Sequence, residues 1–176
     1  MYRRIIVIGP CGSGKSTFSK RLARETGLPL VHLDALYWLP GWKERDKAEF
    51  DALLLEELKK DRWIIDGNYG RTIPLRLQYC DTVIWLDFNR VTCVLGVLRR
   101  VLKGRGKTRD DMGALCPERF DWDFIKYTWN FNRSNREKYR RMLAGVPGVS
   151  IYVVRSRRAL RRIESELICH QEATQP

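Results

Sequence analysis

The chain has 176 residues, 44% of them hydrophobic and 31% charged, and a formal net charge of +12. These values fit one folded domain with a core of its own and exclude a mostly disordered chain. No apolar run reaches the roughly 18 residues that a transmembrane helix needs, and the five widely spaced cysteines do not fit a disulfide framework or a zinc site. We therefore expect a cytoplasmic protein with no export signal and no membrane partner.

The positive charge is unevenly distributed along the chain. Residues 1–89 have a net charge of +2, whereas residues 90–176 have a net charge of +10. A field of this sign favours a polyanionic ligand. The phosphates of a nucleotide or the backbone of a nucleic acid would both satisfy it.

Short apolar segments alternate with segments of helical periodicity along the chain. We predict strands over Arg4–Ile8, Leu30–Leu33, Trp63–Ile65, Thr82–Leu86 and Ser150–Val154. We predict helices over Lys15–Thr26, over the segment that Asp46 caps and that carries Phe50 to Leu58, and over Val91–Leu102, Asp121–Leu143 and Arg157–Ile168. Because strands and helices alternate, we expect a single α/β domain over residues 1–176, with a parallel sheet covered on both faces.

Two segments lack a regular period. Residues 103–120 contain Gly104, Gly106 and Gly113 and are expected to form a mobile loop. Residues 170–176 are expected to form a frayed tail. The helix before the loop has an apolar stripe formed by Val91, Val94, Leu95, Leu98 and Leu102.

The most specific motif is the segment Gly9–Ser16, which fits the phosphate-loop pattern G-x-x-x-x-G-K-[ST] between a buried strand and a helix. Its glycines let the backbone wrap around phosphate, and the helix N-terminus adds a positive dipole end. Lys15 is predicted to reach the β- and γ-phosphates of ATP, and the Ser16 hydroxyl to bind Mg²⁺. The predicted nucleotide contacts are Gly9, Pro10, Cys11, Gly12, Ser13, Gly14, Lys15, Ser16 and Thr17.

One residue of this loop allows two interpretations. Cys11 is either a small residue that fills the loop or, near a helix N-terminus, a thiol whose oxidation would block ATP binding. The sequence favours the first interpretation and leaves the second as a testable hypothesis.

Three carboxylates follow predicted strands, at the sheet edge where ligands of open α/β folds gather. Asp66 closes an apolar strand, as a magnesium-binding aspartate does. Asp34 is predicted either to hold and deprotonate a substrate hydroxyl or to cap a short helix. For Asp87 a structural role is favoured, and His32 is likewise assigned to structure rather than to the site.

The phosphate loop, Asp66–Arg71 and Asp81–Asp87 together resemble adenylate-kinase-like P-loop kinases. A second resemblance, to bacterial proteins labelled DNA topology modulation proteins and also described as small AAA-family ATPases, covers nearly the whole chain. It is carried by His32–Trp38, Pro40–Trp42, Arg45–Asp46, Trp63–Tyr69, Leu86–Phe88 and Val154–Arg157.

These resemblances imply a three-layer P-loop NTPase fold with a five-stranded parallel sheet and a short basic lid over residues 103–120. They also imply that Arg71, and the turn at Gly67, meet the phosphate acceptor. The spacing departs from that of adenylate kinase, because one extra residue separates Gly67 from Arg71 and a Phe-Pro pair is missing. AMP as the acceptor is therefore in doubt.

Basic residues cluster in and around the loop. Arg99, Arg100, Lys103, Arg105, Lys107 and Arg109 fall within eleven residues, and Arg133 and Arg136 follow on the next helix. In a kinase such arginines close over ATP and neutralise charge on the transferred phosphoryl group. We predict that Arg100, Arg133 and Arg136 act in catalysis with Lys15 and Asp34. We also predict that Arg155 and Arg157 lie beside the adenine.

Aromatic residues suggest two further features. Trp38 and Trp42 flank Pro40-Gly41 and either form a stacking surface for a substrate ring or pack between helices. The aromatic residues from Trp122 to Phe131 are expected to form a core under the lid.

Together these patterns predict a nucleoside-monophosphate-kinase-like protein that uses ATP and Mg²⁺. It would transfer the γ-phosphate to an unidentified small acceptor, which is either nucleotide-like or a hydroxylated metabolite. The alternatives are a nucleic-acid-binding ATPase that affects DNA topology, with the basic second half as its binding surface, and a nucleotide sensor that turns nothing over.

Overall fold

The computed structural model describes residues 2–172, and its centre is a sheet of five parallel strands in the order β2-β5-β1-β6-β7. The strands are β1 (Arg4–Ile8), β2 (Leu30–His32), β5 (Trp63–Asp66), β6 (Thr82–Leu86) and β7 (Ser150–Val154). The longer helices are α1 (Lys15–Thr26), α3 (Lys47–Leu58), α5 (Arg90–Gly104), α6 (Trp122–Leu143) and α7 (Arg157–Glu172). This confirms the predicted α/β fold with a five-stranded parallel sheet.

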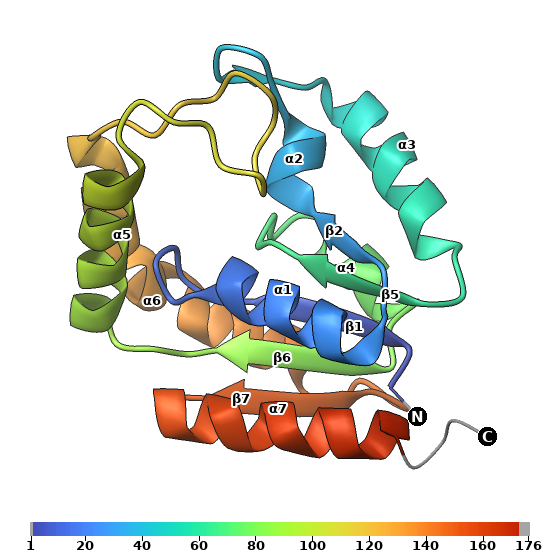
Figure 1. Ribbon diagram of the computed structural model, residues 1–176. Coiled ribbons are helices and arrows are strands. Elements are labelled where there is room, and N and C mark those ends of the chain that lie inside the picture. Colours follow the sequence, from blue (N-terminus) through green and yellow to red (C-terminus); the bar gives the residue numbers. More distant parts are fainter. Residues whose placement is uncertain (1, 173–176) are drawn as a thin grey trace.

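Helices cover both faces of the sheet, which gives three layers (Figure 1). Along β1 the side chains alternate, so that Ile6 and Ile8 join a core with α3, α6 and the short helix α4 (Ile73–Leu77). Ile5 and Val7 point to the opposite face and join a second core with α1 and α7. Successive side chains of a strand point to opposite faces of the sheet, and here helices cover both faces. Almost every residue of such a strand is therefore apolar, as the sequence of the predicted strands shows.

The structure contains short elements that the sequence analysis missed. The predicted strand Leu30–Leu33 ends at His32, because Leu33 already begins the helix α2 (Leu33–Tyr37). A small antiparallel hairpin follows, formed by β3 (Trp38–Leu39) and β4 (Lys43–Glu44), with Gly41 and Trp42 at positive φ in its turn. These elements and α4 are five residues long or less, which is too short to show a hydrophobic period.

Helix α5 packs with a different face from the one that its apolar stripe indicates. Cys93, Val97 and Val101 are buried, whereas Val91, Leu95 and Leu102 are exposed. The reason is a contact between backbones, because a Cβ atom added to Gly96 would overlap the carbonyl oxygen of Gly12. The helix therefore approaches the loop after β1 on its glycine side, and Val91, Leu95 and Leu102 of the stripe face outward while Val94 and Leu98 are half-buried.

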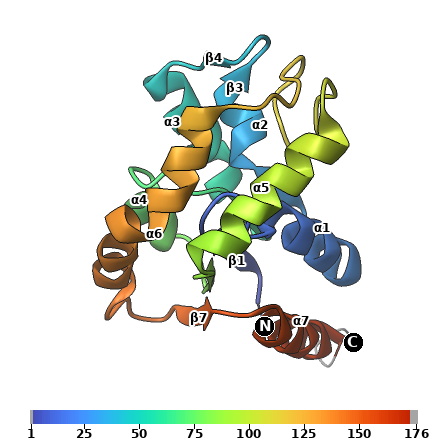
Figure 2. The same cartoon turned by 90° about the vertical axis from the view of Figure 1, so that its left-hand side faces the viewer.

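The segment of residues 105–121, which we call the lid segment, joins α5 to α6 and extends toward α2 and the β3–β4 hairpin (Figures 1 and 2). The Gly41 amide donates a hydrogen bond to the Leu115 carbonyl (3.1 Å), and Trp42 Nε1 donates to the Pro117 carbonyl (3.2 Å). Asp111, Met112, Cys116 and Glu118 are buried. The loop expected over 103–120 begins two residues later, because Lys103 and Gly104 belong to α5. Its mobility stays a prediction.

The C-terminal end differs from expectation in a similar way. Helix α7 continues to Glu172, so the first residues of the predicted frayed tail are helical, and residues 173–176 lie outside the described part of the chain. Within residues 2–172 no helix combines the length and the apolar composition needed to cross a membrane.

The contact between α5 and the loop after β1 predicts a strong effect of Gly96→Ala. The added methyl group would overlap the Gly12 carbonyl, and overpacking of this kind costs about 1–3 kcal/mol. Chemical denaturation should show a free energy of unfolding lower by about that amount. Gly104→Ala, in the same helix, is the control, because its Cβ would meet only the Glu118 side chain at 3.4 Å. Equal stability of the two variants would contradict the packing described here.

Candidate active site

The loop between β1 and α1 has the backbone conformation that phosphate binding requires. Gly9, Gly12 and Gly14 adopt positive φ angles of 144°, 73° and 92°, which L-residues with side chains rarely adopt. A Cβ at Gly9 would lie 2.5 Å from the Leu86 carbonyl oxygen. Gly14 caps α1 without a side-chain hydrogen bond, so the first N–H groups of the helix stay available to an anion.

The Lys15 side chain folds back onto the first residues of this loop. Its Nζ donates hydrogen bonds to the carbonyl oxygens of Gly9 (2.9 Å) and Pro10 (3.1 Å). Burial raises the pKa of the Cys11 thiol although Lys15 opposes the shift. A raised pKa means less thiolate, so the structure favours the interpretation of Cys11 as a loop filler over that of a reactive thiol. Thr17 is exposed at the start of α1.

Asp66, at the end of β5, has one carboxylate oxygen engaged and one without a partner. Its Oδ2 lies 3.1 Å from Nδ1 of His32, whereas its buried Oδ1 has no hydrogen-bond partner among the described residues. A buried carboxylate oxygen without a partner is costly, and a cation would relieve that cost. The donor set of Asp66 and Ser16 therefore fits Mg²⁺, which typically takes one or two protein oxygens and phosphate oxygens.

His32 lies beside Asp66, because the parallel register pairs the two residues directly across β2 and β5. This contact is compatible with the structural role favoured for His32, and the sequence alone did not reveal the pairing. No group of three or more His, Cys, Asp or Glu side chains in residues 2–172 is arranged to hold a metal ion without help from other ligands.

Asp34 lies in the first turn of α2 and accepts a hydrogen bond from the Tyr69 hydroxyl at its Oδ1 (2.8 Å). Burial raises the pKa of Asp34, and the charge of Asp66 adds to the shift, while the Tyr69 hydrogen bond and Lys15 oppose it. A carboxyl group with a raised pKa is better suited to accept a proton at neutral pH. Tyr69 was not foreseen from the sequence.

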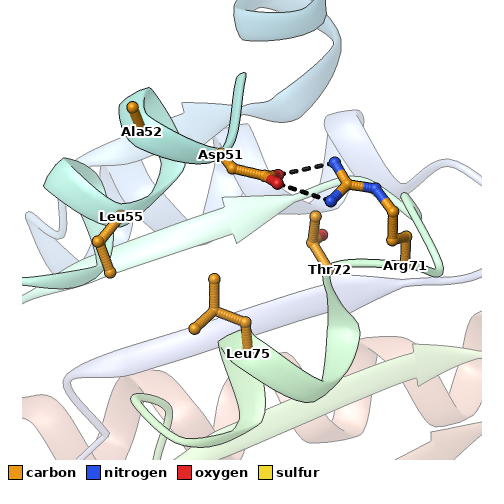
Figure 3. Close-up of a pocket in the computed structure, with 6 residues that line it drawn as sticks. All are labelled: Asp51, Ala52, Leu55, Arg71, Thr72 and Leu75. Carbon is orange, nitrogen blue, oxygen red and sulfur yellow. Dashed lines mark hydrogen bonds and ion pairs between the residues drawn. The ribbon is translucent and has the colours of Figure 1, made fainter. Parts of the chain in front are cut away.

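The chain turns sharply after Asp66. Gly67 packs against Leu33 of α2, whereas Arg71 reaches α3. Gly67 has a φ of 142°, and a Cβ there would lie 2.7 Å from Cβ of Leu33. Arg71 makes a two-pronged ion pair with Asp51 of α3 (2.6 and 2.7 Å), and its predicted contact with an acceptor stays a prediction. Figure 3 shows this pair at a pocket of about 270 Å³, whose other lining residues are Ala52, Leu55, Thr72 and Leu75.

The lid segment brings a second set of charges to the loop. Arg109 lies 2.7 Å from Glu118 and 3.1 Å from Asp111, and Arg100 lies 3.1 Å from the same Glu118 oxygen. Burial would raise the pKa of Asp111, but Arg109 and a hydrogen bond with Ser16 outweigh it and lower the pKa. The ion pairs of Glu118 and Asp111 thus connect the lid segment within itself and to Arg100 of α5.

The other predicted arginines have different surroundings. Arg136 pairs with buried Asp87 (2.8 Å), and Arg155 lies 3.5 Å from the same carboxylate, in line with the structural role favoured for Asp87. Arg133 is exposed on α6. The Arg157 guanidinium lies over the Phe88 ring (5.2 Å) and against Gly14. Contacts of Arg100, Arg133, Arg136, Arg155 and Arg157 with a nucleotide stay predictions.

Aromatic rings pack around Tyr69, the hydrogen-bond partner of Asp34. Tyr37, Phe50 and Tyr69 pack together with ring centroids 4.9–5.4 Å apart. Trp38 packs edge-on against Trp42 (5.4 Å), and the Trp38 carbonyl contacts Gly113 of the lid segment. The expected aromatic core under the lid is wrong for Trp122, Tyr127 and Trp129, which are exposed; Phe131 is buried.

The glycine loop, Lys15 and the parallel sheet define the chain as a P-loop protein with a nucleoside-monophosphate-kinase-like fold. No protein-family model matches it. Its fold is similar to that of shikimate kinase from Acinetobacter baumannii in complex with shikimate. That comparison gives a TM-score of 0.64 and 13% sequence identity, and covers 99% of this chain and 96% of the other. Shikimate kinase from Bacteroides thetaiotaomicron gives a TM-score of 0.57 at 18% identity, over 98% and 99%.

A similarity in sequence extends over part of the chain. The chain is 27% identical over 110 residues to an adenylate kinase of Clavibacter michiganensis subsp. michiganensis (strain NCPPB 382). The match covers 61% of this chain and 54% of that protein, so the chain matches about half the length of that curated relative. The two solved structures share the fold of this chain, and the sequence similarity is to a P-loop kinase. None of the relatives named here is described as a nucleic-acid-binding protein.

The hydrogen bond between Tyr69 and Asp34 predicts the direction of a pKa change. In Tyr69→Phe the carboxylate loses a donor that lowers its pKa, so the pKa of Asp34 should rise further above that of an ordinary aspartate. NMR titration of the side-chain carboxyl groups would measure the shift. Tyr37→Phe is the control, since Tyr37 packs on the Tyr69 ring. An unchanged or lower pKa in Tyr69→Phe would contradict the assigned bond.

Proposed function

We propose that this protein binds Mg-ATP at the phosphate loop and transfers the γ-phosphate to a small hydroxylated acceptor next to Asp34. The observation that carries the proposal is the gathering of three groups at the carboxyl ends of neighbouring strands. These are the glycine loop with Lys15 after β1, the unpartnered Asp66 oxygen after β5, and Asp34 just after β2. The sequence analysis predicted the phosphate loop from its motif, and it singled out Asp66 and Asp34 by their positions after predicted strands.

Each group has a distinct part in the proposed reaction. The acceptor hydroxyl oxygen attacks the γ-phosphorus as the bond between that phosphorus and the β–γ bridging oxygen breaks, and ADP leaves. The hydroxyl proton passes to the Asp34 carboxylate, whose raised pKa suits it to this task. Lys15 stays with the β- and γ-phosphates throughout.

Asp66 and Ser16 would hold the magnesium ion of the nucleotide. When bound, Mg²⁺ would neutralise charge on the phosphates. Arg109 of the lid segment and Arg133 of α6 both stay candidates for contact with the transferred group. Arg109 pairs with Asp111 and Glu118 and would have to leave these carboxylates to reach a phosphate, whereas Arg133 is exposed.

The surroundings of Asp34 favour a hydroxylated acceptor over a nucleoside monophosphate. Arg71, the cation implied by resemblance to adenylate kinases, is engaged with Asp51. The Tyr69 hydroxyl contacts Asp34, and the rings of Tyr37 and Phe50 pack on the Tyr69 ring. A neutral ring or chain with hydroxyl groups fits this lining better than a second phosphate does.

The decisive test of this function is ADP release from Mg-ATP by the full chain. We expect release to rise with one member of a panel of hydroxylated metabolites, with phosphorylated acceptor detected by mass spectrometry. Lys15→Ala should lower the rate by about 100-fold or more, because it removes the cation on the β- and γ-phosphates. Nucleoside monophosphates and duplex DNA form the other arms. Stimulation by DNA alone would contradict the kinase and support the nucleic-acid-binding ATPase, and binding without turnover would support the sensor.

A second prediction separates catalysis from nucleotide binding. Asp34→Asn keeps the size of the side chain but removes the proton acceptor, so kcat with the identified acceptor should fall by about 10²–10⁴-fold. Mg-ATP affinity, measured by titration calorimetry, should stay close to that of the unsubstituted protein. Asp51→Asn, a change to a carboxylate of α3 that pairs with Arg71, serves as the matched control. Equal activity of Asp34→Asn and the unsubstituted protein would remove Asp34 from the mechanism.

A further inference from the structure

Arg76 of α4 is fully buried, and its surroundings are unusual for an arginine. No carboxylate of residues 2–172 lies within ion-pair distance of it. Burial lowers the pKa of Arg76 to about 10, so the guanidinium keeps its charge at neutral pH. Burying a charge without a charged partner is costly, and an apolar side chain of similar size would fill the same space more favourably.

Two N–H groups of the guanidinium donate to successive carbonyl groups, whereas the buried Nε has no hydrogen-bond partner among the described residues. Nη1 donates to the Gly67 carbonyl oxygen (3.0 Å), and Nη2 donates to that of Asn68. Both carbonyls belong to the sharp turn that follows Asp66. A planar fork of N–H groups can hold two neighbouring acceptors at once, which a lysine or an apolar residue cannot do.

The turn that Arg76 holds is connected to the phosphate loop. Asn68 Oδ1 accepts a hydrogen bond from the Gly9 amide (2.9 Å), and Gly9 is the first residue of that loop. The next residue, Tyr69, has a φ of 35°, an angle that a residue with a side chain keeps only where its surroundings enforce it. One buried side chain therefore fixes a turn that contacts both the nucleotide side and, through Tyr69, the acceptor side.

We propose that Arg76 is a positioning residue for nucleotide binding. By holding the Gly67 and Asn68 carbonyls it keeps the Asn68 amide group on Gly9 and so sets the entry of the phosphate loop. Arg76 does not itself touch the nucleotide. This inference rests on the proposed binding of Mg-ATP at that loop, but its structural part, the protection of the Gly9 amide, can be measured without any nucleotide.

The test combines two single variants and their double variant. Arg76→Met removes both donors, and Asn68→Ala removes the acceptor for the Gly9 amide. We expect each to weaken Mg-ATP binding about tenfold in titration calorimetry, which corresponds to the loss of about one hydrogen bond. Since both act through the same bond to Gly9, the double variant should bind no more weakly than Arg76→Met alone. NMR hydrogen exchange without nucleotide should show a faster-exchanging Gly9 amide in both.

Controls separate positioning from a loss of stability. Leu77→Ala leaves a cavity beside Arg76 in the same helix and lowers stability, but it keeps the guanidinium fork. It should leave both Mg-ATP affinity and Gly9 exchange unchanged. Arg76→Lys, which can reach one carbonyl, should give intermediate values. If Arg76→Met does not fold, Arg76→Lys combined with Asn68→Ala provides the same comparison.

Several results would overturn the proposal. Strictly additive losses in the double variant would show that Arg76 does not act through Asn68. The proposal would also fail if Arg76→Met showed an unchanged exchange rate of the Gly9 amide and an unchanged affinity for Mg-ATP. It would fail as well if Leu77→Ala lost as much affinity for Mg-ATP as Arg76→Met does. If the unsubstituted protein does not bind Mg-ATP, the proposed function fails together with the role in nucleotide binding, while the exchange measurement still reports on the bond between Asn68 and Gly9.

Discussion

The placement of β5 between β1 and β2 is the constraint on which the site depends. Its parallel register sets Asp66 opposite Val7 on one side and opposite His32 on the other. Three strands therefore end at the same edge, and the segments that leave them carry the phosphate loop, the unpartnered carboxylate oxygen and Asp34. A slip of one residue in this register would turn Asp66 to the other face of the sheet, away from the loop.

The parts of the fold that sequence reasoning recovered are those with a strong local cause. The strands β1, β5 and β6 are apolar because both of their faces are buried, and the phosphate loop has a motif whose glycines its backbone requires. The α3 start was recognisable from Asp46, whose side chain accepts from the amides of Ala48 and Glu49. In each case a few neighbouring residues determine the structure, so no knowledge of distant contacts is needed.

What the sequence did not reveal depends on contacts between distant segments. The buried face of α5 follows from its approach to Gly12, and nothing within the helix indicates this. The choice of Asp51 as partner for Arg71, and of Glu118 for Arg100, likewise depends on how α3 and the lid segment fold back. His32 and Tyr69 gain their importance only through residues 34 and 35 positions away in the chain. Charge clusters in a sequence therefore overstate how many arginines are free for phosphate.

The contact between Gly12 and Gly96 also limits how this sequence can diverge. In most packed contacts a larger residue on one side can be balanced by a smaller one on the other, so the two positions can change together during evolution. Here both positions already have the smallest residue, and the close approach is between backbones. Neither substitution can be compensated by the other, so a descendant that acquires a side chain at either position has to rebuild the path of α5 beside the phosphate loop.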